Sequence, residues 1–317
     1  IMGVVLSKKK LTSFQIIIMG FSSVILLGTL LLMLPISSKT GEFTSFADAL
    51  FTSTSAVCVT GLIVFDTATY WSLFGQFVIM LLIEIGGMGV ITVAASFAMI
   101  AGRKISLMQR STMQEAIAAP KVGGIVRLTI FVIKATLMIE LLGAVAMSPV
   151  FCRDFGIKGL WMALFHSVSA FCNAGFDLMG VKSPFSSLTL YAGEPLINFP
   201  IMLLIIIGGI GFLTWDDIRA NRFHIHKYRM QSKVILSTTA ILILVPALYF
   251  YFFEFSDLGL KERVLSSLFQ SVTPRTAGFN TVDLTSMSEA GQFITIILML
   301  IGGSPGSTAG GMKTTTI

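Results

Sequence analysis

This chain repeats one pattern three times, as DALFTSTSAVCVTGL (Asp48–Leu62), MALFHSVSAFCNAGF (Met162–Phe176) and SSLFQSVTPRTAGF (Ser266–Phe279). Each copy is an apolar stretch headed by Leu-Phe that leads, nine or ten residues later, to a glycine followed by Leu or Phe. The three glycines are Gly61, Gly175 and Gly278. Each copy is too short to cross a bilayer twice as helix, so we expect three outer hairpins of the same kind.

A second motif follows each copy on the next apolar run. It reads Ile-Gly-Gly-Met-Gly over 85–89, Ile-Gly-Gly-Ile-Gly over 207–211 and Ile-Gly-Gly-Ser over 301–304. The internal unit is thus helix, outer hairpin, helix, with a period of about a hundred residues, longer than that of soluble solenoid repeats.

The composition places these units in a membrane. Hydrophobic residues make up 54% of the 317 residues and charged residues only 12%, too few to cover soluble cores of this length. Three cysteines exclude a disulfide scaffold. Six runs are apolar enough to be membrane helices: Phe14–Leu34, Leu73–Ala101, Leu128–Met147, Leu196–Leu213, Val234–Phe253 and the run from Phe293 onward.

Basic residues occur at every second connection between these runs. The clusters are Lys8, Lys9 and Lys10; then Arg103, Lys104, Arg110, Lys121 and Arg127; then Arg219, Arg222, Lys227, Arg229 and Lys233. The intervening connections are mainly acidic. This alternation is the positive-inside pattern and predicts a cytoplasmic N-terminus and a multi-pass protein of the cell membrane. It also accounts for the net charge of +6 without a nucleic-acid partner.

The hairpins restrict the chemistry of the protein. A helix of about ten residues reaches halfway into the bilayer, and the chain must then return as irregular backbone. Such backbone survives at that depth only inside protein or around a water-filled path. The pore-facing helix end is partially negative and carries no strong anionic ligand, so the exposed carbonyl groups suit a dehydrated monovalent cation.

These hairpins resemble the pore loops of the Ktr/Trk/HKT potassium transporter superfamily, closest to its KtrB-like members, over essentially the whole chain. The resemblance implies a potassium filter of backbone carbonyls, and glycine at its centre goes with potassium preference. The implied filter residues are Val59, Thr60, Gly61, Asn173, Ala174, Gly175, Thr276, Ala277 and Gly278. The implied function is a potassium uptake pore subunit that needs no cofactor, with K+ as the transported ion.

The resemblance also implies partners and a fourth unit. We expect a homodimer with one pore per subunit, docked on a cytoplasmic nucleotide-binding ring. The family has four repeats and this sequence shows three: residues 1–122, 123–230 and 231–317, the last ending in a broken helix. A fourth repeat is absent, and we therefore expect the sequence to be a piece of a longer chain.

A glycine-rich segment follows the last apolar run. Residues 293–301 make only about 14 Å of helix before GGSPGSTAGGMK, which is too polar for lipid, so the helix must break near mid-membrane. The family has an intramembrane gate at this place. The implied gate residues are Gly302, Gly303, Ser304, Gly306, Ser307, Thr308, Gly310 and Gly311; the alternative is a flexible tail.

Several polar side chains fall within the apolar parts. Arg275 beside a filter glycine would repel K+ in the ion path, so we expect it behind the filter, paired with a carboxylate. Lys134 and Glu140 are predicted to be structural, through snorkelling or pairing. Cys58 and Cys172 do not predict zinc, because no third ligand is close in sequence. His166 is predicted to be a hydrogen-bonding residue of the second hairpin helix.

The fold class we predict is an all-α membrane protein with parallel helix–pore-loop–helix repeats around a central ion path. A secondary cation carrier is the nearest alternative, but its repeats are typically inverted, whereas each unit here begins and ends inside. A membrane-embedded enzyme would need Glu84, Glu140 and His166 as acid and base residues. No HExxH, paired-aspartate or Ser/Lys motif supports that reading.

Overall fold

The computed structural model describes residues 12–100, 106–117, 123–222 and 224–317, and its regular elements within these ranges are helices. The predicted all-α class is confirmed. Some residues of the sequence argument lie outside the described ranges: Lys8, Lys9, Lys10, Ala101, Arg103, Lys104 and Lys121.

The helices follow one another in three similar series. The first contains α1 (Ser13–Met33), α2 (Phe46–Val57), α3 (Thr67–Tyr70), α4 (Leu73–Met88), α5 (Val90–Ile100) and α6 (Leu107–Ile117). The second contains α7 (Ile125–Phe155), α8 (Lys158–Phe171), α9 (Pro195–Gly209) and α10 (Phe212–Asn221). The third contains α11 (Met230–Tyr249), α12 (Leu260–Val272) and α13 (Glu289–Leu300). Short single-turn elements join them: Pro35–Ser37, Met179–Val181, Thr189–Tyr191, Ile225–Lys227, Phe250–Glu254 and Leu284–Ser286.

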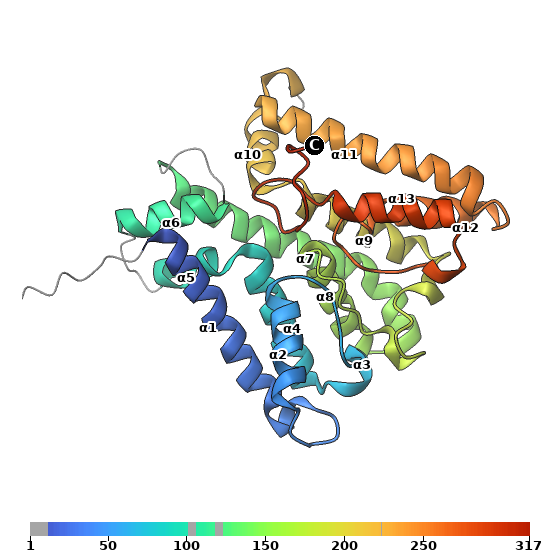
Figure 1. The fold of residues 1–317 in the computed structure, drawn as a ribbon, viewed down its shortest axis with the longest axis horizontal. Helices are drawn as coiled ribbons and strands as arrows, with labels where there is room; N and C mark the ends of the chain where they lie inside the picture. Colours follow the sequence, from blue (N-terminus) through green and yellow to red (C-terminus); the bar gives the residue numbers. More distant parts are fainter. Residues whose placement is uncertain (1–11, 101–105, 118–122, 223) are drawn as a thin grey trace, which may run out of the picture.

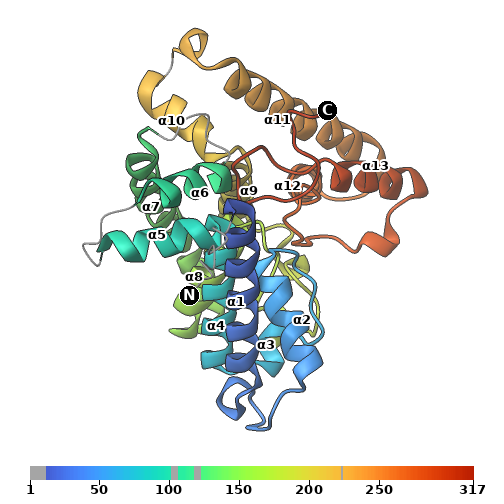
Figure 2. The same ribbon diagram turned by 60° about the vertical axis from the view of Figure 1, so that its left-hand side comes forward.

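Each series opens with a long apolar helix that packs on the short helix after it: α1 on α2, α7 on α8, and α11 on α12. Figure 1 shows α1 on one side of the molecule, α11 on the other and α7 between them. In Figure 2 the molecule is turned, so that α1 stands in the middle, with α7 to its left and α11 to its right. Each of the three short helices α2, α8 and α12 is therefore packed against one long helix.

Helix α1 illustrates why the long helices form. The Thr12 hydroxyl accepts from the Gln15 backbone N–H and the Gln15 side chain accepts from the Thr12 N–H, which is a capping box. The helix stops at Leu34, before Pro35. Leu27 and Leu30 are each 60% exposed, as expected of side chains that face lipid.

Among the described residues, three helices are long and apolar enough to cross a membrane, namely Ser13–Met33, Ile125–Phe155 and Met230–Glu254. Two other expected spans are interrupted. The run Leu73–Ala101 breaks between α4 and α5 at Gly89, and the run Leu196–Leu213 breaks between α9 and α10, which meet at 96°. The prediction of continuous helices was wrong there, because Gly89 (φ +84°) and Gly211 (φ +88°) take left-handed backbone that ends a helix.

The last expected break is present. Helix α13 ends at Leu300, and residues 301–317 form an irregular segment that we call the inner loop. In Figure 1 this loop (red) curls back beside α9 and α10. Ser304 and Thr308 of the inner loop are buried, so it is a packed part of the protein and not a free tail.

Candidate functional site

The three hairpins share one backbone conformation at their tips. Helices α2, α8 and α12 end at Val57, Phe171 and Val272. Beyond each helix end, a non-glycine residue with positive φ is followed two residues later by a glycine with positive φ. The pairs are Val59 (+55°) and Gly61 (+76°), Asn173 (+57°) and Gly175 (+74°), and Thr276 (+63°) and Gly278 (+82°). Positive φ at a non-glycine residue is uncommon, so its recurrence at equivalent places marks one functional geometry built three times.

The three glycines lie next to one another, although about a hundred residues separate them in sequence. A Cβ on Gly61 would collide with the carbonyl oxygen of Ala174. A Cβ on Gly175 would come within 2.5 Å of the carbonyl oxygen of Ala277. Gly278 in turn lies beside the Cα of Gly175. The hairpin tips thus form part of a ring. In it, an oxygen of the second hairpin lies against the glycine of the first, and an oxygen of the third lies against the glycine of the second. We call this the carbonyl ring.

A hydroxyl group holds each hairpin tip from behind. The Oγ of Ser55 donates to the carbonyl of Leu62 at 2.6 Å, and the Oγ of Ser169 donates to the carbonyl of Phe176 at 2.7 Å. The Oγ1 of Thr273 donates to the carbonyl of Phe279 at 2.6 Å. In each case the acceptor is the residue directly after the glycine. The sequence analysis missed these hydroxyls, although the column Ser55, Ser169, Thr273 stands at one place in the three copies.

The glycine pairs of the second motif let the hairpin helices approach closely. A Cβ on Gly86 of α4 would collide with the carbonyl of Val57, the last residue of α2. A Cβ on Gly208 of α9 would collide with the carbonyl of Phe171, the last residue of α8. The carbonyl ends of α2 and α8 are therefore fixed against the following helices. Their partially negative ends are directed toward the carbonyl ring.

The third glycine pair, Gly302 and Gly303, makes contacts of another kind. Gly302 and Gly303 belong to the inner loop, where the N–H of Gly302 donates to Met312 and that of Gly303 donates to Gly310. The loop is attached to the second series by the N–H of Ser304, which donates to Gly209, and that of Thr308, which donates to Gly208. These bonds close the inner loop on itself and fix it to the end of α9.

The inner loop also contacts two hairpin tips. The Thr308 hydroxyl lies 2.9 Å from the carbonyl of Phe171 and 3.0 Å from the side-chain oxygen of Asn173. The N–H of Gly310 donates to the Thr276 hydroxyl at 3.2 Å. The inner loop is thus bonded to the carbonyl ring through the two residues with positive φ, Asn173 and Thr276.

Arg275 is buried behind its hairpin and has a different partner from the one expected. Its guanidinium donates to the hydroxyl of Thr239 on α11 at 3.4 Å, and its carbonyl accepts from the Asn173 amide. Within the described residues no carboxylate pairs with it, and its Nε has no partner. The predicted carboxylate partner was wrong. The direction of the side chain, toward α11, keeps the positive charge away from the ring glycines.

Glu84, Glu140 and Cys172 meet beside the second hairpin. Their ligand atoms lie within 4.8 Å of one another, and the Cys172 thiol is 3.6 Å from Glu84. No third ligand is close to Cys172 in sequence, but α4 and α7 bring two carboxyl groups close to it in space; the expectation that no zinc binds here stays a prediction. The cluster therefore lies where α4, α7 and the end of α8 meet. Cys58, by contrast, is exposed, and Lys134 lies on another face of α7.

His166 plays the structural part predicted for it. It is fully buried in α8, where its Nδ1 lies 2.7 Å from the carbonyl of Met162 and its Nε2 accepts from the N–H of Leu178. Both ring nitrogens are thus engaged, which leaves no free acid or base for the enzyme alternative.

Two carboxylates, Asp66 and Asp177, follow the tips of the first two hairpins in sequence. Asp66 accepts from the N–H groups of Ala68, Thr69 and Phe185, which ties the first hairpin to the loop after the second. Burial, and next the charge of Asp66, raises the pKa of Asp177 to about 6. Asp177 stands two residues after Gly175 in sequence, and its carboxylate accepts from the N–H of Met179.

Comparisons with known proteins agree with this geometry. The model of the TrkH family, described as a cation transport protein, matches residues 7–317. The potassium/sodium uptake protein NtpJ of Enterococcus hirae is 45% identical over 98% of this chain. The Ktr system potassium uptake protein B of Bacillus subtilis is 41% identical over 97% of this chain. The chain spans 69% of the length of each of these two relatives.

A solved structure shares the fold. The potassium transporter TrkH from Vibrio parahaemolyticus matches with a TM-score of 0.69 and 22% identity, over 98% of this chain and 60% of that protein. At that identity the match supports the arrangement of the helices and hairpins alone.

Proposed function

Since this chain belongs to the TrkH family of cation transport proteins, we propose that it is a potassium uptake pore subunit that conducts dehydrated K+ through the carbonyl ring. It is a multi-pass membrane transport protein and not an enzyme, as the relatives named above are uptake proteins. The observation that carries the proposal is the meeting of Gly61, Gly175 and Gly278 with the Ala174 and Ala277 carbonyls between them.

The filter we propose consists of the three residues at each tip. These are Val59, Thr60 and Gly61; Asn173, Ala174 and Gly175; and Thr276, Ala277 and Gly278. Their carbonyl oxygens would replace the water shell of K+. Two features support a monovalent cation: the ring itself carries no carboxylate, and Arg275 is directed away from it, toward α11. A divalent ion prefers several carboxylate ligands, which this ring does not supply.

The inner loop is proposed as the gate. Its residues Gly302, Gly303, Ser304, Gly306, Ser307, Thr308, Gly310 and Gly311 include the contacts to Phe171, Asn173 and Thr276 described above. A loop that is bonded to the tips from inside can open the path only by giving up these bonds. Gly306 and Gly311 have positive φ, so the loop backbone already uses conformations that other residues take rarely.

The relatives and the charge pattern support a proposal for the assembly. We propose a homodimer in the cell membrane with a cytoplasmic N-terminus, docked on a cytoplasmic nucleotide-binding ring. The relatives in the Ktr system support a cytoplasmic regulatory partner. The basic clusters at every second connection support the orientation.

Uptake of radioactive rubidium tests the proposed function. The natural full-length protein that contains this chain should restore uptake of K+ and of Rb+ to bacterial cells that lack other potassium systems. Parallel uptake of radioactive sodium separates a potassium pore from a mixed potassium/sodium pathway. Uptake that stays at the level of cells without the protein would contradict the proposal.

Removal of one of the three hydroxyls that hold the hairpin tips should weaken selectivity for Rb+ over Na+. Ser169→Ala leaves the Phe176 carbonyl without its donor, and one such bond is worth about 1 kcal/mol. We expect the Rb+ to Na+ uptake ratio to fall by roughly fivefold. The matched control is Ser271→Ala, because the Ser271 hydroxyl is also buried but donates within its own helix, to Leu268. An equal fall of the uptake ratio in both variants would show that the hydrogen bond from Ser169 to Phe176 has no special role in selectivity.

A further inference from the structure

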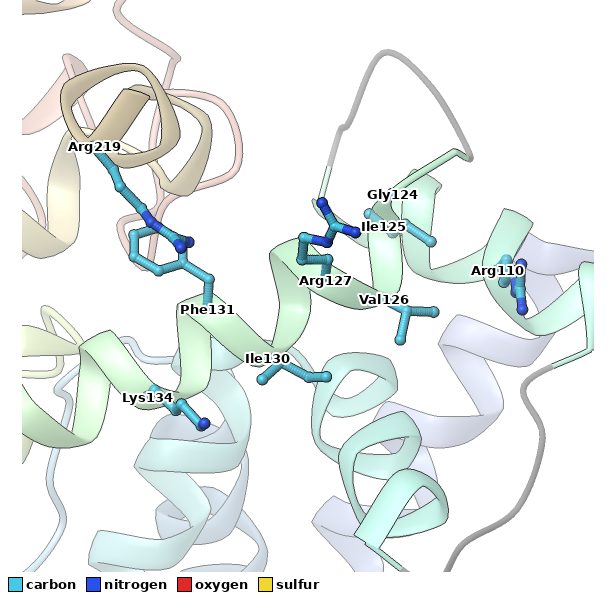
Figure 3. A pocket seen from close by; sticks show the side chains of 9 residues that line it. All are labelled: Arg110, Gly124, Ile125, Val126, Arg127, Ile130, Phe131, Lys134 and Arg219. Atoms are coloured by element: carbon cyan, nitrogen blue, oxygen red, sulfur yellow. The ribbon is translucent and has the colours of Figure 1, made fainter. Parts of the chain in front are cut away.

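A cavity of about 730 Å³ lies at the beginning of α7 and carries four positive charges. It is lined by Arg110 of α6, Arg219 of α10, and Arg127 and Lys134 of α7, together with Gly124, Ile125, Val126, Ile130 and Phe131. Figure 3 shows these side chains around the start of α7, with Arg219 above Phe131 and with Lys134 and Ile130 farther along the helix. The lining contains no acidic residue.

The four cations have no carboxylate partner in the part of the chain that the structure describes. The ion pairs among the described residues involve Arg153, Lys182 and Arg229 and none of these four. Arg219 contacts the Phe131 ring, with the guanidinium carbon 4.5 Å from its centre. The adjoining cavity of about 380 Å³ includes Asp216, but that carboxylate pairs with Arg229 at 3.2 Å and with none of these four. Four positive charges without acidic partners attract an anion from outside the chain.

The backbone at the same place also favours an anion. Helix α7 begins after Gly124, and no side chain caps its first N–H groups. These N–H groups and the positive end of the helix dipole lie at the cavity wall that Gly124, Ile125 and Val126 form. A phosphate oxygen would satisfy both the free N–H groups and the arginine side chains.

The position of Lys134 indicates that the anion carries an acyl chain. Lys134 lies two turns beyond Arg127, about 10 Å along the helix, within the membrane-spanning helix α7. Ile130, Lys134, Leu137 and Leu141 recur at helical spacing on one face of α7, and the three apolar members are 41%, 55% and 61% exposed. This face is therefore the one that contacts lipid. The positively charged part of the cavity thus continues into the apolar face of α7. A phospholipid can occupy both with its phosphate and an acyl chain, whereas a small water-soluble phosphate cannot.

We infer that this cavity is a binding site for one anionic phospholipid, with its phosphate among Arg110, Arg127, Arg219 and the start of α7. Lys134 reaches up from the membrane side to the same headgroup, and an acyl chain lies along Ile130 and Leu137. The lipid then connects α6, α7 and α10. Helix α10 begins at Phe212, whose N–H donates to Gly306 of the inner loop, so the occupied site lies next to the anchor of that loop.

Lipid binding to the purified full-length protein tests this inference. Native mass spectrometry in detergent would count bound phosphatidylglycerol, with phosphatidylcholine of the same acyl chains and free glycerol phosphate as separate arms. We expect phosphatidylglycerol to bind and to raise the melting temperature, and the other two ligands to do neither. Protection by glycerol phosphate alone would overturn the assignment to a lipid, and equal binding of the two lipids would overturn the role of the charges.

A pair of double variants locates the site. Arg127→Gln with Lys134→Gln should weaken phosphatidylglycerol binding by about tenfold or more. Lys227→Gln with Lys233→Gln removes the same charge from residues outside the cavity and should leave binding unchanged. Lys134→Arg alone keeps the charge and should retain binding, which provides a readout should the double variant be unstable. Equal weakening in both double variants would show a non-specific charge effect and would overturn the site.

Discussion

Gly175→Ala is expected to lower Rb+ uptake at least about tenfold, which corresponds to a barrier only about 1.4 kcal/mol higher. The added Cβ would come within 2.5 Å of the Ala277 carbonyl oxygen, so either that oxygen or the whole tip of the second hairpin must move. Gly175 also has a φ of +74°, which costs a residue with a Cβ about 1 kcal/mol. Both effects displace a proposed K+ ligand.

Gly41→Ala separates these two effects. Gly41 has the same φ of +74°, but nothing lies within 4 Å of the Cβ that alanine would add, and it is far from the hairpin tips in sequence. The backbone strain is therefore matched and the collision is absent. Uptake by the Gly41→Ala protein should stay within about twofold of the unmodified protein. A loss as large as that of Gly175→Ala would mean that strain or misfolding, and not displacement of the Ala277 oxygen, reduces uptake.

Deletion of residues 302–311 is expected to increase K+ flux severalfold in the absence of any regulatory partner. The deletion removes Thr308 and Gly310, which hold the inner loop against Phe171, Asn173 and Thr276. The structure also indicates that the shortened chain can close, because Ile301 and Met312 already lie side by side as a bridged pair. Flux is measured as Rb+ entry into vesicles that contain the purified full-length protein alone.

Thr308→Val provides a milder form of the same change. It keeps the length of the loop and removes only the hydroxyl near Phe171 and Asn173, so its flux should lie between those of the intact and shortened proteins. Unchanged flux in both variants, with normal amounts of folded protein in the vesicles, would remove the gating role from the inner loop.

The sequence predicted the features that depend on residue type at a fixed place. Gly61, Gly175 and Gly278 were recognisable because a tip with positive φ and a close backbone neighbour requires glycine. The end of α13 was recognisable because Gly302 and the polar residues after it cannot continue an apolar helix in lipid. The filter and gate roles of these residues stay predictions, which the uptake experiments above address.

The features that sequence reasoning missed depend on contacts between distant segments. Glu84 and Glu140 are separated by a whole hairpin, and only the packing of α4 and α7 brings them to Cys172. The breaks at Gly89 and Gly211 lie in runs that stay apolar, so hydropathy did not reveal them. The hydroxyl column of Ser55, Ser169 and Thr273 was visible, but its partners became clear only when the carbonyls after the glycines were located.

The order of neighbours in the carbonyl ring has a consequence for how the three hairpins can change over time. Gly61 borders an oxygen of the second hairpin and Gly175 borders an oxygen of the third. A side chain added at either glycine would therefore collide with the next hairpin and not with the hairpin that carries it. The first and second copies therefore cannot lose their glycine unless the next copy moves in the same step. Paired substitutions at adjacent tips should accordingly be non-additive, and a double-mutant cycle would measure that dependence directly.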